Sequence, residues 1–501
     1  MKRAVPLALS LLLVPAPSGA ETLREALARA YRENPTITGS RAQQRAVDEN
    51  VPLARAAGRP SLSTDGGVTN NVLRSGNSFT TPERLARAQI GLNVPIYSGG
   101  AVRNSVRAAE TRVEAGQIGL RGTEASLFTE VVAAYNDVIR DEAIVGLNTQ
   151  NVRVLETNLQ ASRDRFQVGD LTRTDVAQSE ARLSLARAQL QRVQATLIGS
   201  RENYVRLVGT APGLLDTPPP LPNLPQSADG AVEVALRDNP NLLAALKQRD
   251  ATAFDIRVAR ASRLPQLGVG VNGGYVNYLG SLGSGTGLGV GQTGTTAGLG
   301  LNVSLPLFQG GRPAAQVRQA QANRALALEQ VTAVERQVIA SSRSAYAVWQ
   351  SSLQVINSSE QAVAANRLSL EGVRAENSVG NRTILDILNA EQELLNSQVT
   401  LVTARRDAYV AGFALLAAMG QAEAQDLGLE AGPLYNSGEN FRAVRGRFSD
   451  FRDGPAPVAV APSTATVPPQ NATVTRPLDP LLDDKVDRTP ALTTGEKTPN
   501  R

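Results

Sequence analysis

The chain of 501 residues contains neither cysteine nor histidine. Without these two residues a protein can form no disulfide bond, no cysteine nucleophile, no Ser-His-Asp triad and no thiolate or imidazole metal site. Carboxylates alone could still bind a metal ion, but no cluster of acidic residues in the sequence suggests such a site. We therefore expect no cofactor and no enzymatic activity.

The chain also lacks a block of one charge and a long hydrophobic run. Its 51 lysine and arginine residues nearly balance 46 acidic residues, and the arginines are scattered among Glu and Asp, which argues against a nucleic-acid partner. Hydrophobic residues make up 42% of the chain, which excludes an acidic disordered chain. No stretch reaches the ~18 apolar residues of a transmembrane helix.

The N-terminus carries a targeting signal. Lys2 and Arg3 precede an apolar run over residues 4–14, and the small residues Ser18 and Ala20 follow that run. This order is typical of a secretory signal peptide and predicts cleavage before Glu21. We therefore expect residues 1–20 to direct export, after which the mature chain could still enter a membrane as β-strands.

Most of the remaining sequence consists of two similar copies, one after the other. The landmarks that recur in the same order, first copy and then second, are Asn34-Pro35 and Asn239-Pro240, Pro95 and Pro306, Gly99-Gly100 and Gly310-Gly311, Val168-Gly169 and Val379-Gly380, Glu180 and Glu391, and Gly209 and Gly420. An internal duplication predicts two structural repeats of similar architecture.

These landmarks set the domain boundaries. We place the first repeat at residues 21–209 and the second at 228–420, with a Pro-rich linker at 210–227 between them. A Gly- and Ser-rich run at residues 280–298 predicts a lengthened surface loop in the second repeat. Residues 421–501 are rich in Pro, Thr, Asp and Ala and predict a C-terminal extension that is mostly disordered.

Each repeat is expected to begin with a helix and continue with two strands. In the first repeat, residues 22–57 show helical spacing, and residues 86–95 alternate apolar and polar side chains. The second repeat alternates in the same way at 266–272 and 298–305, whereas the strand expected after Pro60 has only a weak apolar face. Such strands suit an outer-membrane barrel wall, but they also suit a soluble antiparallel sheet with one solvated face.

The membrane barrel and the soluble sheet differ in whether the strands must form a closed ring. Four strands cannot close a barrel, and open sheet edges are not tolerated in lipid, so a membrane barrel would need strands from several chains. Two chains would give a bore filled by side chains, and three chains would give twelve strands around a wet bore. The inward residues are Gly, Asn, Gln and Ser, which suits the wet bore.

Two long helical segments follow the strands in each repeat. Residues 101–166 contain no proline, which allows a helix of ~100 Å, and a second helix is expected to end near Val208. The second repeat has matching segments at 313–377 and 383–418. Helices of this length need partners along their whole length, which predicts coiled-coil packing.

The turns between these helices contain helix-stop and helix-start signals. Gly169 and Gly380 follow the long helices, where a residue with positive φ commonly ends a helix. Asp175 and Asp386 each lie three residues after a threonine, which is the spacing of a capping box. These residues therefore have a structural role whatever the function is.

The order of motifs in this chain resembles that of the TolC-like outer-membrane efflux proteins. The motifs are EALxxAxxxNP, VPIYSGG and VGDLTRTDV, followed in the second repeat by LPLFQGG and VGNRTILDIL, and the resemblance covers residues 22–420. It implies a mixed α and β membrane protein: a homotrimer with a 12-stranded β-barrel in the outer membrane, four strands per chain, continuous with a long periplasmic α-helical coiled-coil barrel. The resemblance implies a passive exit duct that works with a periplasmic adaptor protein and an inner-membrane pump to export small molecules.

Two other functions remain open at this stage. The same fold serves as the exit duct of type I protein-secretion systems, so the cargo could be a protein. A soluble periplasmic coiled-coil scaffold would also fit the helical pattern, although it would place no sheet in outer-membrane lipid.

The resemblance also assigns roles to the turn residues. In proteins similar to this one, the two turns lie at the periplasmic tip of the duct and dock the adaptor. Val168, Gly169, Val379 and Gly380 are therefore the expected adaptor contacts.

Near the tip, the resemblance implies a constriction and a latch. An aspartate matching Asp386 faces the lumen, and Asn389 stands where a second acid is frequent, so the ring of negative charge should be weakened. An arginine matching Arg382 would hold the tip closed by bonding to Asp175 and Thr174.

The junctions between strands and helices are the last candidate positions. Tyr97 and Phe308 follow strand-ending prolines and suit the periplasmic aromatic belt of a barrel, or packing where strand meets helix. The junction residues themselves are Pro95, Gly99, Gly100, Pro306, Gly310 and Gly311.

Overall fold

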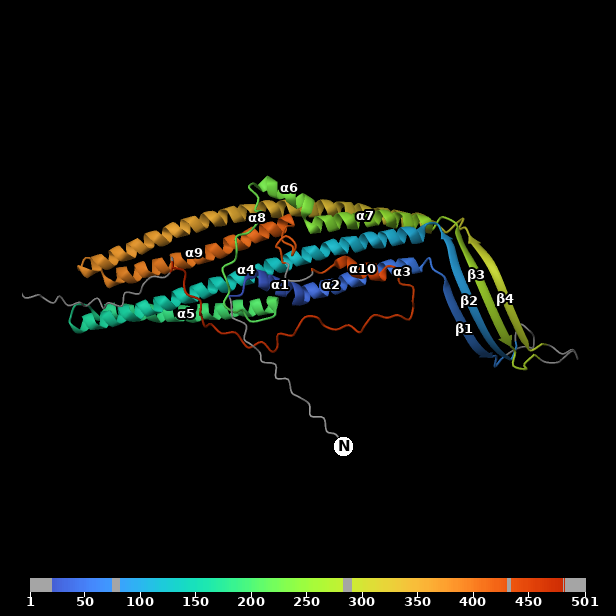
Figure 1. Ribbon diagram of the computed structural model, residues 1–501, viewed down its shortest axis with the longest axis horizontal. Helices are drawn as coiled ribbons and strands as arrows, with labels where there is room; N and C mark the ends of the chain where they lie inside the picture. Colours follow the sequence, from blue (N-terminus) through green and yellow to red (C-terminus); the bar gives the residue numbers. More distant parts are fainter. Residues whose placement is uncertain (1–19, 74–81, 283–290, 430–433, 481, 483–501) are drawn as a thin grey trace, which may run out of the picture.

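The computed structural model describes residues 20–73, 82–282, 291–429, 434–480 and 482. The predicted signal peptide therefore lies almost wholly outside the described residues. The molecule is elongated: helices run along its length, and a four-stranded sheet lies at one end (Figure 1). Within the part that the structure describes, no helix is both long enough and apolar enough to cross a membrane.

Four long helices form two antiparallel hairpins that lie side by side (Figure 1). The first hairpin pairs α4 (Ala101–Gln167) with α5 (Arg173–Val208), and the second pairs α8 (Arg312–Ser378) with α9 (Ile384–Met419). The predicted long helices are therefore confirmed in both repeats. Their 67 and 36 residues correspond to lengths of ~100 Å and ~54 Å.

The first expected helix, residues 22–57, is divided into three. These are α1 (Leu23–Glu33), α2 (Pro35–Asp48) and α3 (Asn50–Ala56). Asn34 adopts an extended conformation because a residue before proline avoids the helical region, and its side chain then caps α2 by accepting from the Thr36 N–H at 2.8 Å.

The second repeat is broken at the equivalent position. Asn239 ends α6 (Ala228–Asp238) and caps α7 (Pro240–Ala261) in the same way. One Asn-Pro pair in each repeat therefore sets the same bend.

The four strands form one antiparallel sheet in the order β1-β2-β3-β4. They are β1 (Ser61–Asn70), β2 (Arg84–Ser98), β3 (Gln266–Asn277) and β4 (Thr293–Ser304). The weakly patterned strand after Pro60 is thus present. Residues 293–298, which composition assigns to a loop, instead extend β4, because every one of them pairs with β3.

The two repeats meet within the sheet. The pairing of β2 with β3 places Asn93 opposite Gly270, with an irregularity between Pro95 and Tyr97. The outer edges of β1 and β4 have no strand partner among the described residues. A sheet with two open edges needs further strands to close in lipid.

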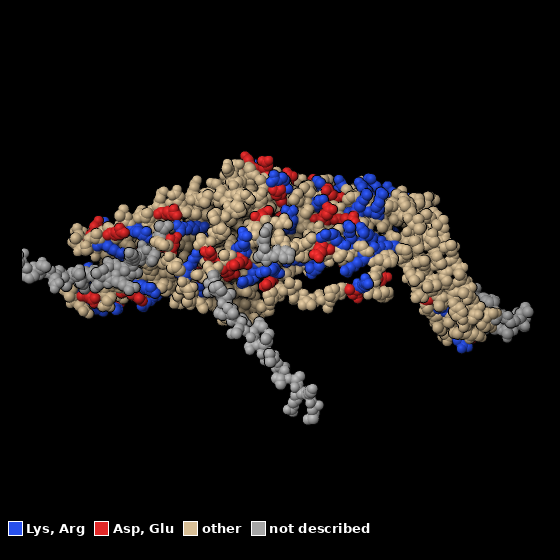
Figure 2. All heavy atoms as spheres, in the orientation of Figure 1, with Lys and Arg blue, Asp and Glu red and all other residues tan. Residues whose placement is uncertain are grey.

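Charge is distributed unevenly along the molecule. The visible face of the sheet is almost free of charged side chains, whereas basic residues crowd the helix ends beside it (Figure 2). The only charged residues within the four strands are Asp65, Arg84 and Arg87. The arginines near the sheet-facing ends of α3, α4 and α7 include Arg55, Arg59, Arg103, Arg107, Arg257, Arg260 and Arg263.

The largest hydrophobic core lies midway along the helices. Phe128 and Tyr135 of α4, Tyr204 of α5 and Phe413 of α9 are each at most 1% exposed and belong to one cluster. This cluster fastens the two hairpins together at a distance from both the sheet and the turns.

The C-terminal extension differs from the predicted disorder over its described part. It contains α10 (Ser437–Val444) and then crosses the hairpins as an extended chain (Figure 1). Arg201 of α5 donates to the Asn471 carbonyl at 2.6 Å, and Arg405 of α9 pairs with Asp479 at 2.8 Å. Leu478 packs against α4, so a few well-placed contacts order a segment that is poor in large apolar residues.

Candidate functional site

The two helix-to-helix turns lie at the end of the molecule farthest from the sheet (Figure 1). Gly169 and Gly380 have φ values of 86° and 85°, a conformation that favours glycine. Val168 and Val379 are 68% and 70% exposed. Each turn therefore presents one apolar side chain to its surroundings, and nothing within the described chain covers it.

A capping box fixes each turn, as the sequence predicts. The Thr172 N–H donates to the Asp175 carboxylate at 2.9 Å, and Thr383 and Asp386 repeat this contact at the same distance. Hydrogen bonds from the threonines hold the pKa of both carboxyl groups below its usual value. Both carboxylates are therefore charged at neutral pH, at the N-terminus of a helix.

The candidate constriction includes a residue that sequence reasoning missed. Asn389 lies one turn after Asp386 on α9, and its Oδ1 accepts a hydrogen bond from Arg182 Nη2 of α5 at 2.7 Å. No motif marks Arg182, because its contact joins two helices from different repeats. The structure therefore places a positive charge beside the position where the sequence lacks a second acid.

The three candidate latch residues are not joined within one chain. Arg382 Nε pairs with Glu376 Oε2 at 2.6 Å, and this pair raises the pKa of Arg382. Asp175 is engaged in its capping box, and Thr174 is exposed. Within the described chain, no hydrogen bond or ion pair connects Arg382 with Asp175 or Thr174. A latch among them would have to form between protomers.

A partly buried ion pair of the second repeat contacts the first repeat near the tip. Glu391 of α9 is 6% exposed; it pairs with Arg374 of α8 at 3.0 Å and accepts from Asn158 Nδ2 of α4 at 3.2 Å. Burial raises the pKa of Glu391 despite its partners. The matching pair of the first repeat, Arg163 and Glu180, is about half exposed on both sides. Glu391 recurs as a repeat landmark, but its burial depends on contacts between the repeats.

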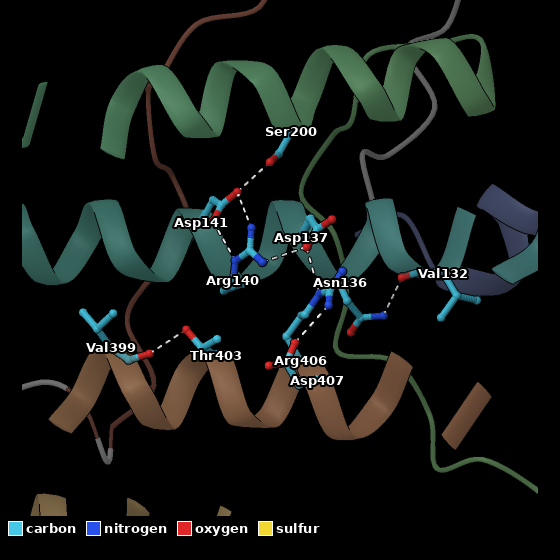
Figure 3. A network of polar contacts seen from close by, with 10 residues as sticks. All are labelled: Val132, Asn136, Asp137, Arg140, Asp141, Ser200, Val399, Thr403, Arg406 and Asp407. Carbon is cyan, nitrogen blue, oxygen red and sulfur yellow. Dashed lines mark hydrogen bonds and ion pairs between the residues drawn. The ribbon is translucent and has the colours of Figure 1, made fainter. Parts of the chain in front are cut away.

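A second polar network lies midway along the hairpins (Figure 3). Arg140 and Arg406 both pair with Asp137, at 2.9 and 2.8 Å. Asp141 pairs with Arg140 at 2.8 Å and accepts from Ser200 Oγ of α5 at 2.6 Å. These contacts join α4, α5 and α9, so they hold the hairpins in a fixed relation.

The junctions between sheet and helices have the geometry that tight bends need. Phe308 is 89% exposed and Tyr97 is 49% exposed, so both are available to surroundings outside the chain. Pro95 lies within β2, and Pro306 follows β4. The four junction glycines all have positive φ: Gly99, Gly100, Gly310 and Gly311.

The described residues contain no group of three or more acidic side chains that could hold a metal ion.

Comparisons with known proteins identify the family. Residues 26–210 and 231–421 match the model of the family described as "Outer membrane efflux protein". The chain is similar to outer membrane efflux protein BepC of Brucella suis biovar 1, with 34% identity over 432 residues that cover 86% of this chain and 92% of the relative. It is 27% identical to outer membrane protein TolC of Escherichia coli K12, covering 92% and 96% of the two chains.

A solved structure supports the same fold. The CmeC outer membrane channel of Campylobacter jejuni superimposes with a TM-score of 0.71 at 14% identity, covering 85% of this chain and 89% of that chain. The two matched regions correspond to the two repeats, including both hairpins and all four strands. The chain therefore belongs to the outer membrane efflux protein family.

Proposed function

We propose that this protein is the outer-membrane channel of a tripartite efflux system, a passive homotrimeric duct for small molecules. One observation carries the proposal: an almost uncharged four-stranded sheet with two open edges lies at the end of two helical hairpins ~100 Å long. Three copies supply the twelve strands that enclose a water-filled bore in lipid, and no edge then remains exposed.

The hairpins continue the bore through the periplasm. The side chains of Val168 and Val379 are exposed at the turns, and they support docking of a periplasmic adaptor at Val168, Gly169, Val379 and Gly380. The adaptor links the duct to an inner-membrane pump, which supplies the energy for transport. The duct itself needs no catalytic group.

The tip is the proposed gate. Asp386 carboxylates from three protomers face the lumen there, and Asn389 lies one helical turn farther along. Arg382 bonds to Asp175 and Thr174 of a neighbouring protomer and holds the tip closed. Within one protomer these groups lie on the two turns at the same end of the molecule, which supports a contact across the trimer axis (Figure 1).

Bilayer recording tests the duct and its latch. We expect the purified protein to give stepwise ion currents in a planar lipid bilayer and to cross-link as a trimer in detergent. Arg382→Ala should raise the single-channel conductance, whereas Arg163→Ala, which removes an exposed ion pair elsewhere in the hairpin, should leave it unchanged. A monomer that carries no current, or recovery of the protein from the soluble periplasm, would overturn the proposal in favour of a scaffold.

Co-purification identifies the cargo class. We expect the native complex to contain an adaptor and a small-molecule pump, and Val379→Asp should weaken that association because it places a charge at the apolar contact. Recovery of an ATP-driven protein exporter instead would assign the duct to type I secretion.

A further inference from the structure

A polar groove runs between the two hairpins on the side of the candidate constriction. Its volume is about 770 Å³, and it lies between α5 and α9 with α4 at its base. The size falls within the range of sites for drug-sized molecules. The polar side chains along it include Asn148, Asn151, Gln189, Gln392 and Asn396.

The groove continues directly from the constriction. Arg182 lines its tip end and bonds to Asn389, and Gln392 and Asn396 follow Asn389 at helical spacing on the same side of α9. With Asp386 facing the lumen, as proposed above, this surface is the next one along α9 from the constriction.

The charge of the groove is positive. Arg182 and Arg192 both line it, and none of its lining residues is acidic. Each arginine donates to a neutral amide oxygen: Arg182 to Asn389 at 2.7 Å, and Arg192 to Gln189 at 2.9 Å. Neither forms an ion pair within the described chain. Arg187, between them on α5, is instead paired with Glu156 at 2.8 Å.

The groove also has apolar walls. Leu155 of α4, Leu185 of α5 and Val399 of α9 line it, and Leu185 is 66% exposed. The two arginines stand ~15 Å apart along α5, so one ligand can meet them in succession. An apolar body bearing a single anionic group would complement both the walls and the unpaired guanidinium groups.

From these contacts we propose that the groove binds amphipathic organic anions, such as aromatic carboxylates or sulfonates, during export. This inference rests on the proposed duct function and names a substrate class for it. The anionic group pairs with Arg182 or Arg192 in place of the amide contact, and the apolar part lies against the leucine and valine side chains. Cations of the same shape are repelled by the same two arginines.

A matched pair of probes tests this assignment. Binding of 1-naphthalenesulfonate and of 1-naphthylmethylammonium to the detergent-solubilised trimer is measured by equilibrium dialysis. We expect the sulfonate to bind at least tenfold more tightly than the ammonium probe. The variant Arg182→Gln/Arg192→Gln should lose that preference, whereas the control Arg187→Gln should keep it because Arg187 already has a carboxylate partner.

Three results would overturn the inference: equal binding of both probes, sulfonate binding unchanged in the double variant, or binding of neither probe because another protomer covers the groove. Bilayer currents recorded from the same preparation separate this failure from failure of the duct itself. A conducting trimer without anion preference rejects only the groove, whereas a preparation without current rejects the duct.

Discussion

At the scale of single residues, the two repeats contain equivalent ion pairs that lie in different environments. Glu391 of the Arg374–Glu391 pair is buried against Asn158, whereas both members of the Arg163–Glu180 pair are about half exposed. Removing one partner of a buried pair leaves the other charge without compensation, whereas an exposed pair contributes little.

Glu391→Ala should therefore destabilise the trimer by about 2 to 3 kcal/mol, since Arg374 keeps some contact with water. Glu180→Ala should cost only about 0–1 kcal/mol. Thermal melting of the detergent-solubilised protein, followed by circular dichroism, compares the two variants. Equal melting temperatures would show that the contacts of the buried Glu391 carboxylate contribute no more than those of Glu180.

We expect Glu124 to make the start of the C-terminal extension sensitive to pH. Its carboxylate accepts from the Ala424 N–H at 2.5 Å, and burial raises the pKa of Glu124 to about 7 even though Arg41 and Arg121 lower it. A raised pKa means that the folded protein binds this proton more tightly than the unfolded chain does. The stabilisation is therefore complete below the unfolded value of 4.5 and is lost as the pH rises through about 7.

We expect Glu124→Gln to remove most of this pH dependence, which amounts to about 3 kcal/mol for a shift of this size. Hydrogen exchange of the segment after Ala424, measured at pH 5 and pH 8, provides the test. The wild type should exchange faster at the higher pH, after correction for intrinsic rates, and the variant should show nearly equal protection. A pH difference that persists in the variant would assign the effect to another group.

Residue-level predictions from sequence succeed where the interaction is local. The capping boxes of Asp175 and Asp386 are confirmed because threonine and aspartate lie three residues apart. Arg182 could not be found in this way, since Asn389 lies in the other repeat and no spacing rule connects them. The latch and adaptor contacts remain predictions, because they depend on other chains.

At the scale of elements, α5 and α9 occupy equivalent places in the two repeats, and each is followed by a glycine. The surroundings of these two glycines differ. Gly209 has a φ of 90° and no atom near the position of an added Cβ, whereas at Gly420, with a φ of 77°, that Cβ would lie 2.5 Å from the Asp238 carbonyl oxygen. Both positions disfavour other residues, but only the second also resists an added methyl group sterically.

Gly209→Ala should cost about 1 kcal/mol from backbone conformation alone. Gly420→Ala should cost more, because the backbone of the α6–α7 bend must move. Melting temperatures and yields of folded trimer measure the difference. Comparable losses in the two variants would mean that the bend yields easily.

The same local rules explain which elements can be predicted. The long helix α4 contains no proline, α8 has one only in its first turn, and a glycine closely follows each helix, so their limits follow from the sequence. The helix expected over residues 22–57 does not include a break at Asn34. The break follows from Pro35, which disfavours the helical conformation of the residue before it. Strand β1 shows little alternation of apolar and polar side chains, so its sequence predicts a strand only weakly. It forms a strand because it pairs with β2 along its whole length.

At the scale of the whole molecule, the duplication predicts how neighbouring protomers join. Strand β2 matches β4 in the repeat, and β3 matches β1, so the β2–β3 pairing is a template for the contact of β4 with β1 of the next protomer. Asn93 faces Gly270 in the template, and by repeat equivalence Ser304 should face Asp65 of the neighbour.

The chain has no native cysteine, so a pair of introduced cysteines gives an unambiguous test. Ser304→Cys/Asp65→Cys should oxidise to a disulfide-linked trimer that withstands boiling in detergent until it is reduced. The control Ser304→Cys/Asn70→Cys displaces the second thiol by ~17 Å along β1 and should stay monomeric on the gel. Cross-linking in the control alone would show a different register.

The arginines crowded beside the sheet have a mechanical consequence. If the sheet lies in lipid, sliding the protein outward would carry guanidinium groups such as those of Arg103 and Arg260 into hydrocarbon, where each costs ~2–4 kcal/mol at mid-depth. Sliding it inward would expose apolar strands to water. The barrel is thereby anchored at one height, and force applied by a pump at the far end deforms the helices before it displaces the barrel.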